Sequence, residues 1–123
     1  MNKVILMGRL ARDPETQTTT TGKLKCRMTI AVDRPKAKDG TQNADFIGLV
    51  AWERTAEFAD KYLSKGQRIL VEGRIQTGSY EKDGEKRYTT DVVCERIEFA
   101  DRKGSGRKED DGGEYARDED IVF

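Results

Sequence analysis

Residues 45–75 constrain the fold of this chain more than any other stretch, because their pattern allows a strand, a short helix and a second strand in succession. Residues 45–52 (DFIGLVAW) are apolar on both faces, as in a strand inside a closed sheet. The apolar residues of 56–63 (AEFADKYL) then recur at helical spacing. Residues 67–75 (QRILVEGRI) alternate, which predicts a strand with Ile69, Val71, Gly73 and Ile75 on one face.

The limits of this helix are predicted from its end residues. Thr55 is the expected N-cap, and Glu57 lies in the expected first turn, where a negative charge is favourable to the helix dipole. Lys65 and Gly66 predict the end, because glycine readily adopts the left-handed cap conformation. One short helix is therefore expected between two strands.

The N-terminal part of the chain predicts two more strands. Residues 3–10 (KVILMGRL) contain four consecutive apolar residues, which favours a strand covered on both sides, with a bulge or bend at Gly8. The polar residues 15–23 are either a loop or a weak edge strand. Residues 24–32 (LKCRMTIAV) alternate regularly, with Leu24, Cys26, Met28, Ile30 and Val32 on one face.

The C-terminal part of the pattern completes the fold. A long hairpin is expected around Asp83 and Gly84, followed by a strand over residues 88–99 whose alternation shifts, which predicts a bulge. We therefore predict an all-β fold with one short helix, a five-stranded OB-fold barrel in the order β-β-β-α-β-β. A two-sheet sandwich also accommodates five strands, but it does not need a helix at that place.

The net charge of zero conceals two different parts. Residues 1–100 carry 18 Lys+Arg and 15 Asp+Glu, whereas residues 101–123 carry 5 and 8. The basic part is the expected folded domain. Residues 101–117 have no apolar periodicity and are predicted to be a disordered linker, because such a segment cannot offset its ordering entropy. Residues 118–123 form an acidic tip that ends in three apolar residues.

Composition excludes several classes of protein. No apolar run reaches 18 residues and no export signal precedes the domain, so a cytoplasmic location is expected. Cys26 and Cys94 lie in strand patterns and are interpreted as buried reduced thiols rather than as a disulfide or a metal site. The chain has no histidine, metal-ligand cluster, phosphate loop or nucleophile motif. We therefore expect no metal, no cofactor and no enzymatic activity.

Several segments resemble the bacterial single-stranded DNA-binding protein (SSB) family. They are NKVILMGRLARDPE, AVDR, AWERTAEFADKYLSKGQRILVEGRI and YTTDVV within residues 1–100, and the final DEDIVF, which is similar to the family's acidic tip. The resemblance implies a homotetramer that binds single-stranded DNA without sequence specificity during replication, recombination and repair. It also implies a location at the nucleoid in the cytoplasm, and recruitment of partner proteins through the tip.

Such a protein needs aromatic surfaces for bases and basic residues for phosphates. The resemblance places three stacking positions on Phe46, Trp52 and Tyr80, and a fourth on Lys36, which is not aromatic. For Phe46 and Trp52 the alternative is core packing; Tyr80 lies on a polar hairpin arm. The candidate phosphate contacts, for which the alternative is a role in solubility, are Lys3, Arg9, Lys25, Arg27, Arg34, Arg54, Arg74 and Arg87.

The acidic tip is the candidate partner-binding site. Its charges are Asp118, Glu119, Asp120 and the terminal carboxylate, beside the apolar Ile121, Val122 and Phe123. Charges of this kind steer a peptide toward a basic-rimmed pocket that an apolar side chain fills. The family usually has proline at the position of Val122. The alternative is a random apolar end on a solvated tail.

Three other classes of function are compared with this one. An enzyme would need catalytic groups, and the sequence has no histidine, metal-ligand cluster, phosphate loop or nucleophile motif. An OB module that binds only proteins would not need three aromatic positions beside basic strand residues, and quenching of the only tryptophan, Trp52, by oligo(dT) separates the two. An RNA-binding protein similar to cold-shock proteins is distinguished by competition between oligo(dT) and oligo(U).

Overall fold

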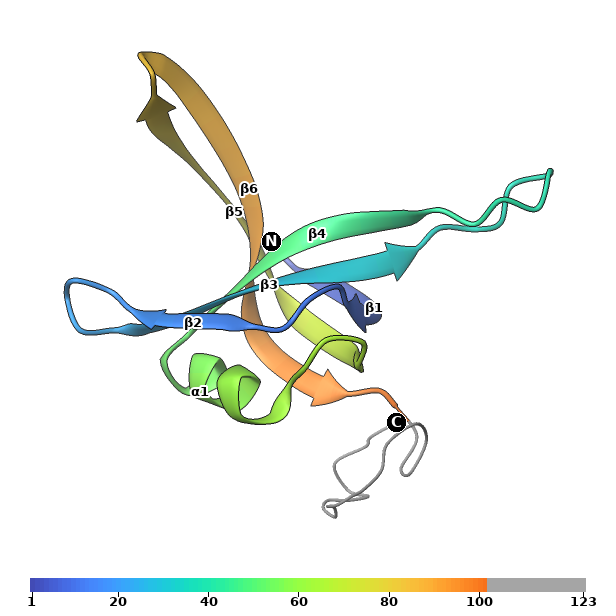
Figure 1. Ribbon diagram of the computed structural model, residues 1–123, viewed down its shortest axis with the longest axis horizontal. Helices are drawn as coiled ribbons and strands as arrows, with labels where there is room; N and C mark the ends of the chain where they lie inside the picture. Colours follow the sequence, from blue (N-terminus) through green and yellow to red (C-terminus); the bar gives the residue numbers. More distant parts are fainter. Residues whose placement is uncertain (102–123) are drawn as a thin grey trace.

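The computed structural model describes residues 1–101, and these form six strands and one helix (Figure 1). In chain order they are β1 (Val4–Leu10), β2 (Glu15–Thr18), β3 (Leu24–Asp33), β4 (Ala44–Trp52), α1 (Glu53–Tyr62), β5 (Arg68–Lys82) and β6 (Glu85–Phe99). The predicted order is confirmed, and the polar run before β3 supplies the short β2. No helix in this part of the chain is long and apolar enough to cross a membrane.

Five of the strands close into a ring. The sheet order is β1-β5-β6-β4-β3-β2, and β1 also pairs with β3. The β1–β3 contact is short, with Arg9 opposite Ala31 and Leu10 opposite Ile30. The β4–β6 contact is parallel and equally short. The predicted OB-fold barrel is therefore confirmed, with β2 outside the ring as a partner of β3.

The inward faces of the strands form the core. Cys26, Met28 and Ile30 of β3 are buried, as their alternation predicted, together with Ile69 and Val71 of β5. Burial of such side chains contributes about 1.5–3 kcal/mol each to folding. Both cysteines are free and buried, as expected. Burial raises the pKa of the Cys94 thiol to about 12.

Gly8 lies where β1 crosses β3 to close the barrel. A Cβ on Gly8 would lie 2.2 Å from the backbone oxygen of Ala31, which is far inside van der Waals contact. The register of β1 with β5 does not shift at Gly8, so this glycine marks a close approach of two backbones rather than the predicted bulge. Any side chain here would separate the strands at the barrel's closing contact.

The predicted helix start is wrong by three residues, because Thr55 was the expected N-cap and Trp52 is the observed one. The helix begins at Glu53, and Trp52 is the N-cap, without a side-chain hydrogen bond. Strand β4 runs directly into α1, and Glu53 makes the turn with a positive φ of 49°. The helix ends at Tyr62 rather than near Lys65, because Leu63 takes an extended conformation and enters the core.

Two apolar strand stretches carry exposed side chains in this chain. The apolar stretch of β1 is not covered on both sides, because Ile5 is 65% exposed and Met7 is exposed beside it. Ile75 is exposed although Ile69 and Val71 on the same face are buried. The reason is that β5 leaves the barrel near Ile75 and continues into a hairpin that projects from the molecule (Figure 1).

This projecting hairpin, the β5–β6 arm, has the predicted turn. Asp83 and Gly84 both have positive φ, as a two-residue turn requires. The predicted bulge in β6 is present, because the register shifts between Glu72 and Gly73 and leaves Glu95 without a partner on β5. The predictions for residues 102–123, including the linker and the tip, lie outside the described residues.

Candidate nucleic-acid interface

Strand register places four of the predicted site residues on one face of β3 and β4. Residues directly opposite each other in an antiparallel pair share a face. Lys25 is opposite Trp52, and Ala31 is opposite Phe46. Arg27 lies two positions from Lys25 and so shares that face, because side chains alternate along a strand. The opposite face of β3 supplies the core.

The same face continues across β6 and along the arm. Leu49 of β4 pairs with Val92 of β6 and both are buried, so their neighbours Gly48 and Asp91 share the outward side. Arg87 lies four positions before Asp91 on β6, and Tyr80 of β5 is directly opposite Arg87. We call this surface the outer face; it carries Lys25, Arg27, Phe46, Gly48, Trp52, Tyr80, Arg87 and Asp91.

The aromatic residues of the outer face are accessible to different degrees. Phe46 is 68% exposed, so it is not a core residue in this chain. Tyr80 is also exposed, as expected for the polar arm. Trp52 is half-buried at the end of β4, and the Lys25 ammonium lies 5.3 Å from its ring centroid. A cation at this distance interacts favourably with the ring. The same ammonium group could also contact the phosphate of a base stacked on Trp52.

Four of the eight predicted phosphate-contact residues form ion pairs within the chain. Lys3 Nζ lies 2.6 Å from a Glu72 oxygen and 3.6 Å from a Glu95 oxygen, and Arg74 is 3.3 Å from Glu95. The other two pairs join Arg34 to Asp45 at 2.7 Å and Arg87 to Glu85 at 3.4 Å. The hydrogen bond with Glu72 raises the pKa of Lys3, and it lowers the pKa of Glu72.

The remaining four basic residues divide by position. Arg9 donates a hydrogen bond to the backbone oxygen of Gly66 at 2.8 Å, on the β1 side of the barrel. Arg54 lies in the first turn of α1, two residues after Trp52. Lys25 and Arg27 form no ion pair with any acidic residue within residues 1–101. These two are therefore the cations of the outer face most available to a phosphate.

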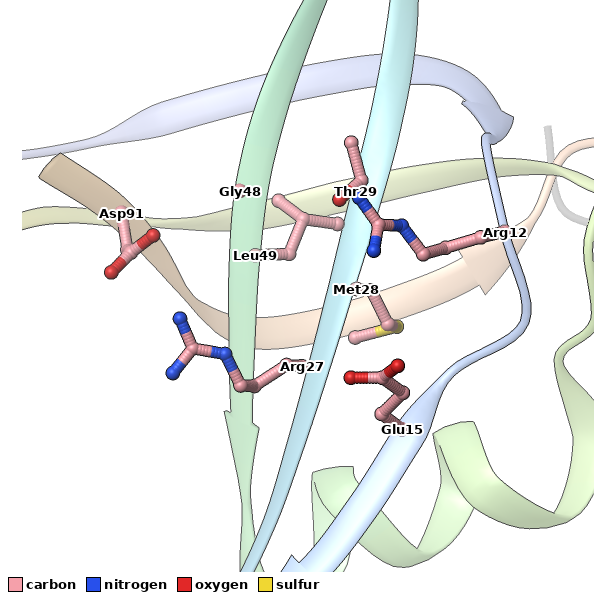
Figure 2. A pocket seen from close by; sticks show the side chains of 8 residues that line it. All are labelled: Arg12, Glu15, Arg27, Met28, Thr29, Gly48, Leu49 and Asp91. Atoms are coloured by element: carbon pink, nitrogen blue, oxygen red, sulfur yellow. The ribbon is translucent and has the colours of Figure 1, made fainter.

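Apart from Arg27, sequence reasoning missed the residues that surround Gly48. A hollow of about 170 Å³ opens on the outer face there, lined by Arg12, Glu15, Arg27, Met28, Thr29, Gly48, Leu49 and Asp91 (Figure 2). Arg12 lies after the end of β1, where no alternation exists to show its direction. Glu15 is opposite Arg27 across β2 and β3, which could be known only after β2 was recognised as a strand.

Tyr88 is a second aromatic residue that the sequence did not single out. It is 77% exposed and lies opposite Ser79, whereas Tyr80 lies opposite the neighbouring residue Arg87. Tyr88 and Tyr80 therefore occupy opposite faces of the arm. Only Tyr80 belongs to the outer face, so Tyr88 serves as an internal control for it.

Comparisons with known proteins identify a matching family and several relatives. Residues 1–100 match the model of the Single-strand binding protein family. "Single-stranded DNA-binding protein 2" of Clostridium acetobutylicum is 52% identical over 101 residues, covering 80% of this chain and 76% of that protein. "Single-stranded DNA-binding protein" of Oceanobacillus iheyensis is 42% identical over 117 residues, covering 94% and 73%. The protein of that name from Staphylococcus aureus is 42% identical over 113 residues, covering 90% and 72%.

Proposed function

We infer, from the fact that this chain belongs to the single-strand binding protein family, that it binds single-stranded DNA along the outer face without sequence specificity. It is a binding protein and not an enzyme. The observation that carries the proposal is that Phe46, Trp52 and Tyr80 lie on one continuous face with Lys25 and Arg27, which have no acidic partner within residues 1–101. Bases stack on the rings, and the cations neutralise the phosphates between them.

The proposed phosphate contacts are unequal in strength. Lys25 and Arg27 have no acidic partner among the described residues, whereas Arg34 and Arg87 form ion pairs with Asp45 and Glu85. An exposed ion pair is worth little in free energy, so a phosphate can still displace the carboxylate. We rank Lys25 and Arg27 first and the paired cations second.

Salt dependence tests the electrostatic part of this proposal. Each phosphate neutralised on a single strand contributes about −0.7 to the slope of log K against log salt. Lys25→Gln and Arg27→Gln should each make the slope shallower by about 0.7, measured by fluorescence anisotropy with labelled oligo(dT). Lys61→Gln on α1 is the charge-matched control and should leave the slope unchanged. A flat response of the unaltered protein would contradict the proposal.

We also propose that the chain assembles as a homotetramer through the outward side of β1. Ile5 and Met7 are exposed there next to Leu70 of β5, since Met7 is opposite Leu70. Exposed apolar groups of this kind mark surfaces that another protein covers. A second copy of the chain would bury them and also protect the free edge of β1.

Charge substitution on β1 tests the assembly. The double variant Ile5→Glu with Met7→Glu should lower the mass in sedimentation to that of smaller species, because two charges would have to be buried in the interface. Thr20→Glu, in the exposed turn after β2, is the control and should retain the full mass. An unaltered protein that sediments as a stable monomer at micromolar concentration would refute the homotetramer.

The remaining proposals rest on the sequence. We propose that residues 1–100 are the DNA-binding domain and residues 101–117 a linker. The tip, residues 118–123, recruits replication, recombination and repair proteins to DNA that the domain protects. Its charge pattern and its similarity to the family's tip support this role. The corresponding location is the nucleoid in the cytoplasm.

A further inference from the structure

Gly48 leaves a bare patch in the middle of the outer face. Side chains two positions apart on a strand lie about 7 Å apart on the same face, so Phe46 and Gly48 are immediate neighbours there. With no side chain at Gly48, the backbone of β4 forms the floor of the hollow that Arg12, Glu15, Arg27 and Asp91 surround (Figure 2). A flat ring stacked beside Phe46 can extend over this floor.

The side chain that lines the hollow nearest to Gly48 is the carboxylate of Asp91. A Cβ on Gly48 would lie only 2.7 Å from Oδ1 of Asp91, so the absence of a side chain is what admits the carboxylate. None of the ion pairs within residues 1–101 involves Asp91. Its oxygens therefore remain available as hydrogen-bond acceptors at the edge of the outer face.

A carboxylate at this place selects what can enter the hollow. Asp91 and Glu15 each repel a phosphate, whereas Arg12 and Arg27, which also line the hollow, can hold the phosphates at its rim. An ionised carboxylate only accepts hydrogen bonds, so the group beside it must donate. The exposed edges of unpaired bases carry such donors, whereas the sugar-phosphate backbone of DNA carries none.

We propose that this hollow is a base subsite in which Asp91 accepts hydrogen bonds from the Watson–Crick edge of guanine in preference to thymine. The proposal rests on the proposed binding of single-stranded DNA along the outer face. It adds one subsite with a base preference to a face that otherwise tolerates any sequence. Gly48 admits the base, Phe46 stacks beside it and Asp91 reads its edge.

The preference for guanine follows from the number and position of donors. Guanine presents two adjacent donors on this edge, the N1–H and the 2-amino group, which match the two oxygens of one carboxylate. Thymine presents a single N3–H between two carbonyl oxygens, which the carboxylate repels. A bidentate pair discriminates between bases by about 1–3 kcal/mol, and the open hollow corresponds to the lower end, which is about fivefold in affinity.

Hypoxanthine provides the sharpest probe, because it differs from guanine only by lacking the 2-amino group. We compare an oligonucleotide of alternating dT and dG, which has no consecutive guanines, with the same oligonucleotide carrying deoxyinosine in place of dG. The unaltered protein should bind the dG form about fivefold more tightly. Asp91→Asn should abolish this difference, because the amide presents one acceptor and one donor where guanine needs two acceptors side by side.

Two further variants separate base reading from charge and from shape. Glu57→Gln removes one negative charge from α1, outside the hollow, and should leave the fivefold difference intact. Gly48→Ala places a methyl group against Asp91 and should reduce the difference while oligo(dT) binding persists. Equal affinity of the unaltered protein for the two oligonucleotides, or a difference that survives Asp91→Asn, would overturn the subsite. Failure to bind either one would instead refute the proposed function.

Discussion

Replacing Phe46 and Trp52 together by alanine should weaken the binding of oligo(dT) by about 2–6 kcal/mol, because each stack of a base on an aromatic ring contributes about 1–3 kcal/mol. Both rings lie on β4 on the same side of the sheet, so one strand of DNA can contact them in succession. The affinity is measured by anisotropy at a salt concentration where the unaltered protein is not saturated.

The control for this prediction is Tyr88→Ala. Tyr88 is at least as exposed as Phe46, but it lies on the opposite face of the arm from Tyr80. Its removal should leave affinity within about threefold of the original, in line with the small effects of surface substitutions away from a site. Phe46→Ala is measured alone as well, since Trp52 is half-buried and its loss also affects stability. Unchanged affinity in a folded Phe46→Ala protein would show that DNA does not use this ring.

Deleting residues 118–123 should abolish the capture of replication and repair proteins while leaving DNA affinity equal or slightly higher. The tip carries three acidic side chains and the terminal carboxylate within six residues, next to Ile121 and Phe123. Charges steer the tip to a basic-rimmed pocket and the Phe123 ring fills it, so both parts are lost together. Affinity for DNA rises most at low salt, where the acidic tip competes best for the basic face.

A variant with the same six residues in a scrambled order is the matched control for this deletion. It keeps the charge of the tip and therefore its competition with DNA, but it moves the phenylalanine and its carboxylate apart. Capture from a bacterial lysate should fail for the scrambled tip as it does for the deletion. If the shortened protein still captured the same partners, the tip would act only to keep the protein in solution.

The barrel could be predicted from the sequence because alternation fixes which face of each strand is buried. The pattern of β3 assigned Cys26, Met28 and Ile30 to the core correctly, and the break in β6 revealed its bulge. The start of α1 was predicted wrongly because Trp52 caps the helix through its backbone alone, which leaves no side-chain signal. The exposure of Ile5 in the single chain was not predicted, because an apolar pattern does not show whether the same chain or another subunit buries the side chain.

The site could be predicted only in part, for a different reason. The resemblance identified Phe46, Trp52 and Tyr80, and the register then placed them on one face. Which cations have acidic partners depends on distant pairings, such as Lys3 with Glu95, that no local pattern reveals. The hollow depends on Gly48 and Asp91, which are 43 positions apart and meet only where β4 and β6 run in parallel.

Titration of the intrinsic fluorescence of Trp52 with oligo(dT) tests most directly whether DNA binds along the outer face. Trp52 is the only tryptophan of the chain, so its signal reports one place on that face. Stacking of a base against the ring predicts a saturable loss of fluorescence that added salt reverses, with Tyr88→Ala behaving like the unaltered protein. An oligo(dT) that binds by anisotropy without changing the fluorescence of Trp52 would place the DNA on another surface and contradict this account.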